Sequence, residues 1–282
     1  MPEDPKQRII DYYHTRESLW GYPLVLGGAK HFGYYPPEVA GLSMRQALRI
    51  MEDVMGRTIG LPPSAKVLDA GSGMGRVAVY LAKHFGYQVE GIDLLEFNVN
   101  EARRFSKRSN AGGRTNFHAG DYSRLPFADR TFDAVYTMET LVHAPDFRAT
   151  LAEFRRVLKP GGRLVLFEYT ITPYADMEPG ARRSYQAVIE GTAMHALPEF
   201  AHDSFPGHLS ASGFTNPVVI DATDRMLPMW RRFNQLAMVP YTVLKRTGVH
   251  QSRYINTVFS IEWFRYRQHF RYNLVTARKP ER

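Results

Sequence analysis

A glycine-rich loop is the first feature of the sequence whose residue types and spacing could do chemistry. Gly71-Ser72-Gly73-Met74-Gly75 follows the short apolar run Lys66–Ala70 and precedes a helix-like segment at residues 76–85. Glycines at such a turn allow a tight bend, and they let backbone N–H groups approach a ligand with no Cβ in the way. The spacing is GxGxG and differs from the GxGxxG of a dinucleotide fingerprint. We therefore expect the loop to bind a ligand that has no pyrophosphate.

Three acidic residues stand at the ends of successive strand-like runs. Asp69 lies just before the glycine loop, Asp93 ends the next run, and Asp121 follows the third. A carboxylate at such a position can accept two hydrogen bonds from a ribose diol, and Asp121 could reach an adenine amino group. Each acid alone could equally cap a helix or stabilise a turn. All three together, at the edge where such sheets bind ligands, favour a ligand that contains adenosine.

From residue 66 to residue 169 the chain resembles the class I S-adenosylmethionine-dependent methyltransferases almost without interruption. Their first motif is matched by VLDAGSGMGRVAVYLAK and the second by EGIDLLEFNVNEAR. The third and fourth are matched by HAGDYSRLPFADRTFDAVYTMETLVHAPD, and the fifth by LAEFRRVLKPGGRLVLFEY. The resemblance implies that S-adenosyl-L-methionine is the cofactor and that the protein is a methyltransferase.

The resemblance also implies which residues surround each part of the cofactor. The loop glycines and Asp69 would contact the methionine portion, Asp93 the ribose, and Asp121 with Tyr122 the adenine. The expected cofactor contacts are Asp69, Gly71, Ser72, Gly73, Gly75, Asp93, Leu94, Gly120, Asp121, Tyr122, Met138 and Tyr34. We expect no metal site, because His14, His195, His202 and His208 do not have the spacing of metal ligands.

A narrower resemblance points to the sterol C-methyltransferases. The segment METLVHAPD at residues 138–146 is similar to their E-A-x-x-H-A-P motif, and FEYTIT at 167–172 followed by Ile189-Glu190-Gly191 is similar to the stretch after their fifth strand. HFGYY at 31–35 is like the S-F-H-F and H-x-G-Y segments of these and related lipid, terpenoid and tocopherol enzymes. The chain is shorter than a typical sterol enzyme, its aromatic motif is altered, and its segment 226–268 departs from that pattern.

The residues expected at the methyl exit suit chemistry at carbon. Methylation of an alkene or an electron-rich ring leaves a carbocation, which aromatic rings and carboxylates stabilise and from which a base removes a proton. We predict Glu139, His143 and Glu190 as the polar catalytic set, together with Tyr13 from the N-terminal segment. The alternatives are a hydrogen bond from Glu139 to the amino-acid part of the cofactor, a structural role for His143 before Pro145, and a solvated helix position for Glu190.

These residues require a sheet that brings the strand ends to one edge. Strand-like and helix-like runs alternate from residue 66 to about 278, as a parallel sheet with helical crossovers requires. We predict an α/β fold with a Rossmann-like seven-stranded mixed sheet and helices on both faces. Its strands are expected at 66–70, 88–92, 115–119, 132–137, 163–169, 216–221 and 270–277, and helices at 76–85, 98–109 and 147–158.

Two further segments are expected to cover the open end of the sheet. Residues 1–64 contain an amphipathic helix near 43–55 and an aromatic segment from Asp11 to Tyr35, which is too apolar for a disordered tail. We predict an N-terminal helical lid over 1–64. The remainder, 65–282, is expected to be the S-adenosylmethionine-binding domain with a helical cap insertion at about 222–268, a segment rich in Met and aromatic residues.

Composition excludes several classes of protein and chemistry. The 282 residues include no cysteine, so disulfides, thiolate nucleophiles and zinc–thiolate sites are excluded. No stretch approaches the roughly 18 apolar residues of a membrane helix, and no signal peptide is recognisable, so we expect a cytoplasmic protein. The net charge of +8 could suit an anionic substrate, a nucleic acid or a membrane, but the basic residues are dispersed and favour a solvated surface.

Three functional classes follow from these observations. The Met- and aromatic-rich cap favours methylation, most simply at carbon, of a small lipophilic acceptor such as a prenyl, terpenoid, indole or sterol-like natural product. The second class is N- or O-methylation of a small metabolite with His143 as the base. A nucleic-acid methyltransferase is disfavoured, because Met138-Glu139-Thr140-Leu141 stands where an (N/D)-P-P-(Y/F) motif is expected. The long N-terminal segment could exchange between the protomers of a homo-oligomer.

Overall fold

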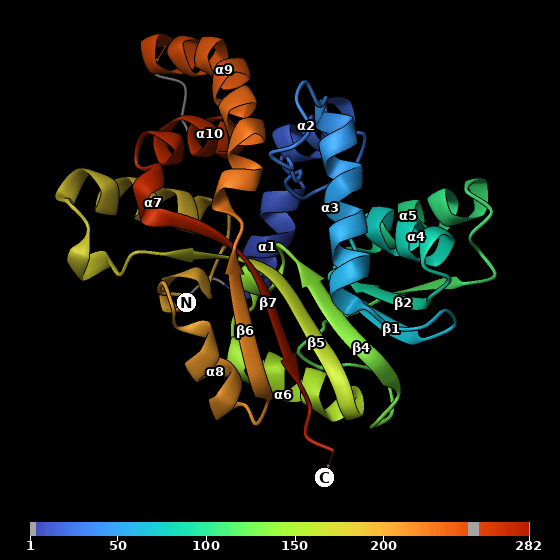
Figure 1. The fold of residues 1–282 in the computed structure, drawn as a ribbon. Coiled ribbons are helices and arrows are strands. Elements are labelled where there is room, and N and C mark those ends of the chain that lie inside the picture. Colours follow the sequence, from blue (N-terminus) through green and yellow to red (C-terminus); the bar gives the residue numbers. More distant parts are fainter. Residues whose placement is uncertain (1–3, 248–253, 282) are drawn as a thin grey trace.

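The central sheet contains seven strands in the order β3-β2-β1-β4-β5-β7-β6 (Figure 1). The computed structural model describes residues 4–247 and 254–281. β1 to β5 pair in parallel, whereas β7 runs antiparallel to both β5 and β6, so the predicted mixed Rossmann-like sheet is confirmed. The strands are β1 (Lys66–Ala70), β2 (Gln88–Asp93), β3 (Thr115–Ala119), β4 (Phe132–Met138), β5 (Leu158–Ile171), β6 (Thr215–Asp221) and β7 (Phe270–Arg278).

The central strands are buried on both faces, which explains why they read as continuous apolar runs. Val67 and Leu68 of β1, Val135 of β4, and Leu164 and Val165 of β5 are all fully buried. The carboxyl ends of these parallel strands meet at one edge of the sheet. That edge is where ligands bind in open α/β sheets, so the strand order itself places the acids of the sequence motifs together.

Helices connect the strands much as predicted, with two exceptions. α4 (Arg76–His84), α5 (Glu96–Arg108) and α6 (Phe147–Val157) match the expected helices, whereas α7 (Pro179–Gly191) and α8 (Phe205–Ala211) were not anticipated. Pro160-Gly161-Gly162, shortly after α6, lies within β5. There Gly161 has a left-handed φ of 72°, and the register between β4 and β5 shifts, because the chain bends before it joins the sheet.

Three helices precede the sheet: α1 (Pro5–Tyr13), α2 (Arg16–Leu26) and α3 (Met44–Ile59). A capping box between Ser43 and Gln46 begins α3, and Gly60 in the left-handed conformation ends it. Its apolar face is buried, and α3 packs on α4 and β5. α3 therefore contacts the sheet domain directly, while α1, α2 and the loop at 27–43 cover the strand ends. The predicted domain boundary at residue 64 stays a prediction.

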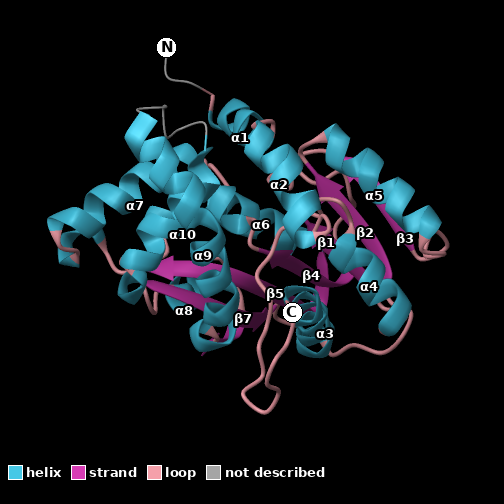
Figure 2. Ribbon diagram, turned by 90° about the horizontal axis from the view of Figure 1, so that it is seen from above, coloured by secondary structure: helices cyan, strands magenta, loops and turns pink. Residues whose placement is uncertain are grey.

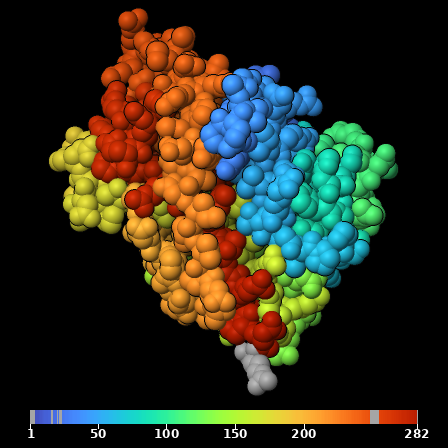
Figure 3. Space-filling view, in the orientation of Figure 1, coloured from blue at the N-terminus to red at the C-terminus, as the bar shows by residue number. Residues whose placement is uncertain are grey.

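The insertion between β6 and β7 consists mainly of two packed helices, α9 (Thr223–Thr247) and α10 (Ile255–Arg265). Trp230 of α9 and Trp263 of α10 are fully buried, so much of the aromatic content of this segment is core. Figures 1 and 2 show α1, α2, α9 and α10 gathered at the same end of the sheet. The space-filling view shows the blue N-terminal segment and orange α9 side by side on this surface (Figure 3).

Hydrogen bonds join the N-terminal segment to the insertion. The Tyr12 hydroxyl donates to Asn256 Oδ1 at 2.7 Å, and the Tyr35 N–H donates to the Arg225 carbonyl at 2.8 Å. Glu17 accepts the backbone N–H groups of Asn256 and Thr257 at the start of α10. The two segments therefore form one cover over the strand ends.

The described residues contain no helix long and apolar enough to cross a membrane. Nor do three or more of their His, Asp or Glu side chains come together in an arrangement that could hold a metal ion. A cytoplasmic location, the absence of a metal or nucleic-acid partner, and assembly through the N-terminal segment stay predictions.

Candidate active site

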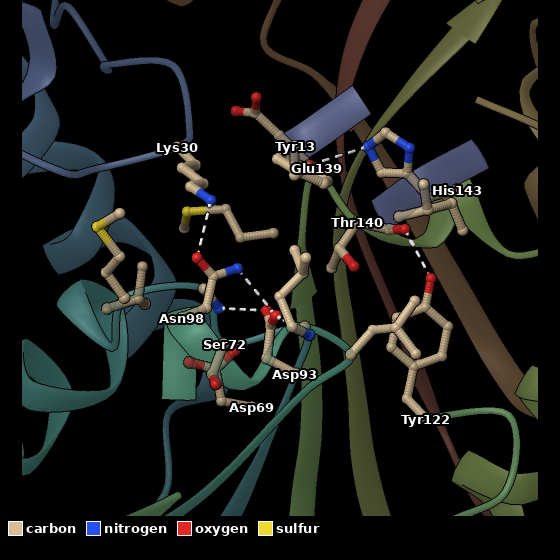
Figure 4. Close-up of a pocket in the computed structure, with 18 of the residues that line it drawn as sticks. Tyr13, Lys30, Asp69, Ser72, Asp93, Asn98, Tyr122, Glu139, Thr140 and His143 are labelled. Atoms are coloured by element: carbon tan, nitrogen blue, oxygen red, sulfur yellow. Dashed lines mark hydrogen bonds between the residues drawn. The ribbon is translucent and has the colours of Figure 1, made fainter. Parts of the chain in front are cut away.

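A cavity of about 100 Å³ lies at the carboxyl ends of β1, β2 and β4 (Figure 4). It extends from the N-terminal helix α1 across the glycine loop to the residues that follow β4. Most of the predicted cofactor residues line it: Asp69, Gly71, Ser72, Gly73, Asp93, Leu94, Gly120, Asp121, Tyr122 and Met138. The structure thus brings together residues that are up to 69 positions apart in the chain, the separation between Asp69 and Met138.

The glycine loop has a conformation that needs glycine. Gly71 has a φ of 91°, and a Cβ added there would lie 2.2 Å from Thr140 Oγ1. Gly75 has a φ of 73° at the start of α4, and its Cβ would lie 2.8 Å from the Phe117 ring. Gly75 therefore allows the helix to pack closely on β3, and it does not itself line the cavity, unlike the other loop glycines.

Asp93 is held in place by three donors. Its Oδ2 accepts the Gly73 N–H at 2.8 Å, while Oδ1 accepts the Leu95 N–H at 3.0 Å and the Asn98 amide at 2.9 Å. Hydrogen bonding to three donors fixes the orientation of the carboxylate before any ligand arrives. Figure 4 shows Asp93 and Asn98 connected in this way at the floor of the cavity.

Asp69 supplies the test of whether the cavity suits S-adenosylmethionine. Its carboxyl group is buried, and its Oδ2 has no hydrogen-bond partner; the same is true of the Ser72 hydroxyl. Burial raises the pKa of Asp69 to about 7. Unpartnered buried polar atoms are rare and costly, and a ligand with an ammonium group and hydroxyls would satisfy them. The residues present therefore fit this cofactor, with Asp69 and the glycine loop beside its methionine part.

At the other end of the cavity, α1 closes over the predicted adenine site. Lys6 of α1 forms an ion pair with Asp121 Oδ2 at 2.6 Å, and the Tyr122 hydroxyl donates to the Thr140 carbonyl at 2.9 Å. Burial alone would raise the pKa of Asp121, but its bonds to Lys6 and Ser123 outweigh burial and lower it. Asp121 is thus ionised and already bonded by the lid.

A second, larger cavity of about 260 Å³ adjoins the first. Its wall comes mainly from α1, α2, α9 and α10, and it is largely apolar. Five residues line both cavities and mark the junction between them: Tyr13, Lys30, His31, Glu139 and His143. Apolar side chains surround the rest, among them Leu26, Phe32, Met194, Phe233, Leu236 and Phe259.

Glu139 is the most constrained residue at the junction. It follows β4 with a φ of 58°, a left-handed conformation that is uncommon for a residue other than glycine. Its Oε1 accepts the Phe32 N–H at 2.6 Å and the Tyr272 hydroxyl at 2.9 Å, and its Oε2 accepts the Tyr169 hydroxyl. Burial raises its pKa, although His31 and the donors oppose this effect. Such local strain is typical of functional sites.

His143 and Tyr13 meet on the opposite side of the junction. His143 Nδ1 lies 3.1 Å from the Ala193 carbonyl, and Nε2 lies 3.2 Å from the Tyr13 hydroxyl. Burial lowers the pKa of His143 to about 4, so the ring is neutral at pH 7. Since Nδ1 must donate to the carbonyl, Nε2 is an acceptor that faces both cavities. The catalytic roles of Glu139, His143 and Tyr13 stay predictions.

Besides Gly75, two predicted site residues lie outside both cavities. Glu190 is exposed near the end of α7, which turns Val188 and Ile189 inward; its backbone carbonyl accepts a bond from Arg8 at 2.7 Å. Tyr34 lines neither cavity, and its N–H donates to the Ala47 carbonyl of α3. Neither residue lines the two cavities, and the catalytic role of Glu190 and the cofactor role of Tyr34 stay predictions.

Several residues at the junction were missed by the sequence reasoning. His31 is the first residue of HFGYY, whose resemblance was recognised, and Lys30 directly precedes it, yet neither side chain was assigned. His31 is buried, with Nδ1 2.9 Å from the Phe32 carbonyl and Nε2 3.8 Å from Glu52. Nothing in the sequence marks Tyr169 and Tyr272 as site residues, because a tyrosine in a buried strand usually belongs to the hydrophobic core.

Comparison with known proteins gives one match along the whole chain and others over part of it. A family model described as a methyltransferase domain matches residues 68–166. The S-adenosyl-L-methionine-dependent Diels-Alderase iccD of Talaromyces variabilis is 35% identical over 99% of this chain and 97% of its own length. Sterol 24-C-methyltransferase ERG6B of Gibberella zeae is 33% identical over 64% of this chain and 46% of its own, so the alignment spans about half of that enzyme.

Solved structures share the fold over nearly the whole chain. The [4+2]-cyclase SpnF superposes with a TM-score of 0.76 at 24% identity, covering 94% of this chain and 93% of that one. A geranyl diphosphate methyltransferase in complex with geranyl diphosphate and sinefungin gives a TM-score of 0.74 at 19% identity, covering 98% and 99%. With the sequence motifs, the cavity that they line and the full-length relative in agreement, the chain belongs to the class I S-adenosylmethionine-dependent methyltransferases, an enzyme family, and S-adenosyl-L-methionine is its cofactor.

Proposed function

We propose that the protein transfers a methyl group from S-adenosylmethionine to a carbon atom of a small lipophilic acceptor held in the second cavity. The observation that carries this proposal is the position of Glu139, whose buried carboxylate lies at the junction of the two cavities among aromatic side chains. Phe32 and the rings of Tyr169 and Tyr272 surround it, with centroids near 6 Å from one another.

This environment suits a reaction that passes through a cation. The bound cofactor supplies an electrophilic methyl group on a good leaving group. The apolar wall excludes water and aligns the acceptor carbon with that methyl group. Aromatic faces and the Glu139 carboxylate stabilise the positive charge that forms on the acceptor. The proton is then lost to a nearby acceptor atom, and the candidate is His143 Nε2, which is unprotonated at pH 7 and would exchange its bond with Tyr13 for the proton.

Sequence relatives support the same choice. Several sterol C-methyltransferases are 30–34% identical to this chain over 59–76% of its length. Their names assign them methylation at carbon of a lipophilic substrate. These relatives do not match the whole chain, so the acceptor of this protein has to be identified by experiment.

The test is incubation of the protein with S-adenosylmethionine and a panel of prenyl, terpenoid, indole and sterol-like compounds. A product 14 mass units heavier, with its heteroatoms free and a new C–CH₃ signal by NMR, is expected. Glu139→Gln should reduce turnover about 100-fold or more and leave S-adenosylhomocysteine affinity within about threefold. Glu190→Gln, a matched change at an exposed position, should alter neither. Full activity of Glu139→Gln would remove the carboxylate from the mechanism.

A [4+2] cyclisation is a second candidate, favoured by one observation. The relative iccD matches 99% of this chain, including both helix pairs that build the second cavity, whereas ERG6B matches 64%. In such a reaction the cofactor is not consumed, and the apolar wall folds one polyene so that two C–C bonds form within it. The Tyr13 hydroxyl, once turned from His143 Nε2 to the substrate, would donate to a carbonyl group and polarise it. A product of unchanged mass, formed with S-adenosylhomocysteine as well, would identify this reaction.

N- or O-methylation is the alternative that the neutral His143 supports. Its Nε2 accepts a hydrogen bond from Tyr13 and could equally accept a proton from a hydroxyl or amine of the acceptor. In the same assay, a product 14 mass units heavier with the new methyl group on oxygen or nitrogen would favour this reading over the first.

A further inference from the structure

We propose that Lys30 holds the cofactor by an ion pair with the carboxylate of its methionine part. This inference depends on the cofactor and not on which of the three reactions follows. The methionine part of S-adenosylmethionine carries a carboxylate as well as an ammonium group. Asp69, Asp93 and Asp121 can receive its hydrogen-bond donors, but they repel the carboxylate. A cation beside the glycine loop is therefore needed.

Lys30 lies where that cation is required. It belongs to the loop after α2, and its Cδ is 3.9 Å from the point where a Cβ of Gly73 would stand. Its ammonium donates to Asn98 Oδ1 at 3.1 Å and lies 4.5 Å from the centroid of the Tyr13 ring. Figure 4 shows the side chain reaching down from the lid toward Asn98, above Ser72 and Asp93. A small rotation of its flexible stem would bring the ammonium over the loop.

The other basic side chains of the cofactor cavity are engaged elsewhere. Of the described residues that line it, Lys6, Lys30 and Arg76 are the lysines and arginines. Lys6 pairs with Asp121 at the adenine end. The Arg76 guanidinium stacks on the Phe105 ring, 4.1 Å from its centroid. Of these three side chains, Lys30 is the one that lines both the cofactor cavity and the second cavity.

The electrostatics of Lys30 favour an anionic ligand. Burial lowers its pKa to about 8, although Asp93 opposes the shift, so the side chain is still protonated at pH 7. A carboxylate in the cavity would stabilise the charged form of this buried ammonium, in addition to the contacts that Lys30 already makes. The same residue lines the second cavity, so a cofactor bound in this way would also hold the lid loop against the acceptor site.

The experiment compares two ligands by isothermal titration calorimetry at pH 7. S-adenosylhomocysteine carries the amino-acid part, whereas 5′-methylthioadenosine keeps the adenosine and sulfur and lacks the carboxylate and ammonium. Lys30→Met should weaken S-adenosylhomocysteine binding by about 10- to 100-fold, because this is the range for a charge-assisted hydrogen bond. The same substitution should change 5′-methylthioadenosine binding by less than about twofold. Lys30→Arg should retain most of the affinity for both.

Lys6→Met is the matched control, because it removes a second lysine of the same cavity at the adenine end. Any effect it has should be equal for the two ligands. An unchanged affinity of Lys30→Met for S-adenosylhomocysteine would overturn the proposal. An equal loss of affinity for both ligands would also overturn it, because Lys30 would then only support the shape of the cavity. Because no acceptor is present, a failure here is independent of whether the protein methylates carbon.

Discussion

Cofactor affinity should depend on pH, with a maximum between pH 7 and 8. The acid side of this profile comes from Asp69. Because burial raises its pKa to about 7, its carboxylate becomes protonated as the pH falls through 7 and can no longer pair with the ammonium of the cofactor. For a group with this pKa, binding at pH 6 should be about eightfold weaker than at pH 7.5. The alkaline side comes from Lys30, whose pKa is about 8.

Calorimetric titration of S-adenosylhomocysteine between pH 5.5 and 8.5 measures the profile. His31 lines the same cavity, and its contacts with Glu52 outweigh burial and raise its pKa, so it is a second group to consider. The assignment therefore depends on Asp69→Asn, which should bind at least tenfold more weakly at pH 7.5 and lose most of the dependence below pH 7. 5′-Methylthioadenosine should show a flat profile with both proteins. An acid side that persists in Asp69→Asn would refute the reasoning and point to His31.

Two further predictions test the loop and the core. Asp93→Ala should weaken S-adenosylhomocysteine binding about 100-fold or more by calorimetry, because the N–H groups of Gly73 and Leu95 lose their acceptor and the ribose its partner. Glu168 is fully buried, and burial raises its pKa to about 7. Its ionised form therefore destabilises the folded state. The free energy of unfolding should fall by about 3 kcal/mol as the pH rises from 4.5 to beyond 7. Glu168→Gln should remove this slope in urea unfolding at pH 5 and pH 8.

The parallel part of the sheet and the cofactor residues could be predicted because their signals are local. β1 and β4 are short, largely apolar runs, and Asp69, Asp93 and Asp121 stand at or just after the ends of β1, β2 and β3. Parallel pairing then brings all these ends to one edge, whatever the exact helix boundaries. Asp69, Asp93 and Asp121 could therefore be assigned to one cavity without knowledge of any side-chain contact.

The junction could not be predicted in the same way, because it depends on pairing between distant segments. Tyr169 of β5 lies directly opposite Tyr272 of β7 in the antiparallel register, so both hydroxyls reach Glu139 from one face of the sheet. A shift of one residue would turn Tyr272 to the other face. Residues 222–269 separate β6 from β7, and nothing in their sequence sets that register.

The exposed position of Glu190 has a related cause. Its assignment was taken from a resemblance in the sequence after β5, and a helix places only some of its positions toward a site. In α7, Val188 and Ile189 are buried, so the next residue is turned to solvent. A resemblance in sequence fixes the element but not the direction of each side chain along it.

The bonds of Glu139 couple the lid to the chemistry of the junction. One donor, the Phe32 N–H, belongs to the N-terminal loop, whereas the two tyrosine hydroxyls belong to the sheet. If the loop moves away, the carboxylate loses its 2.6 Å bond from a backbone N–H, and its ionised form becomes less stable in the apolar surroundings that remain. The negative charge that would stabilise a cation on the acceptor is thus best maintained when the lid is closed, which is also when water is excluded from both cavities.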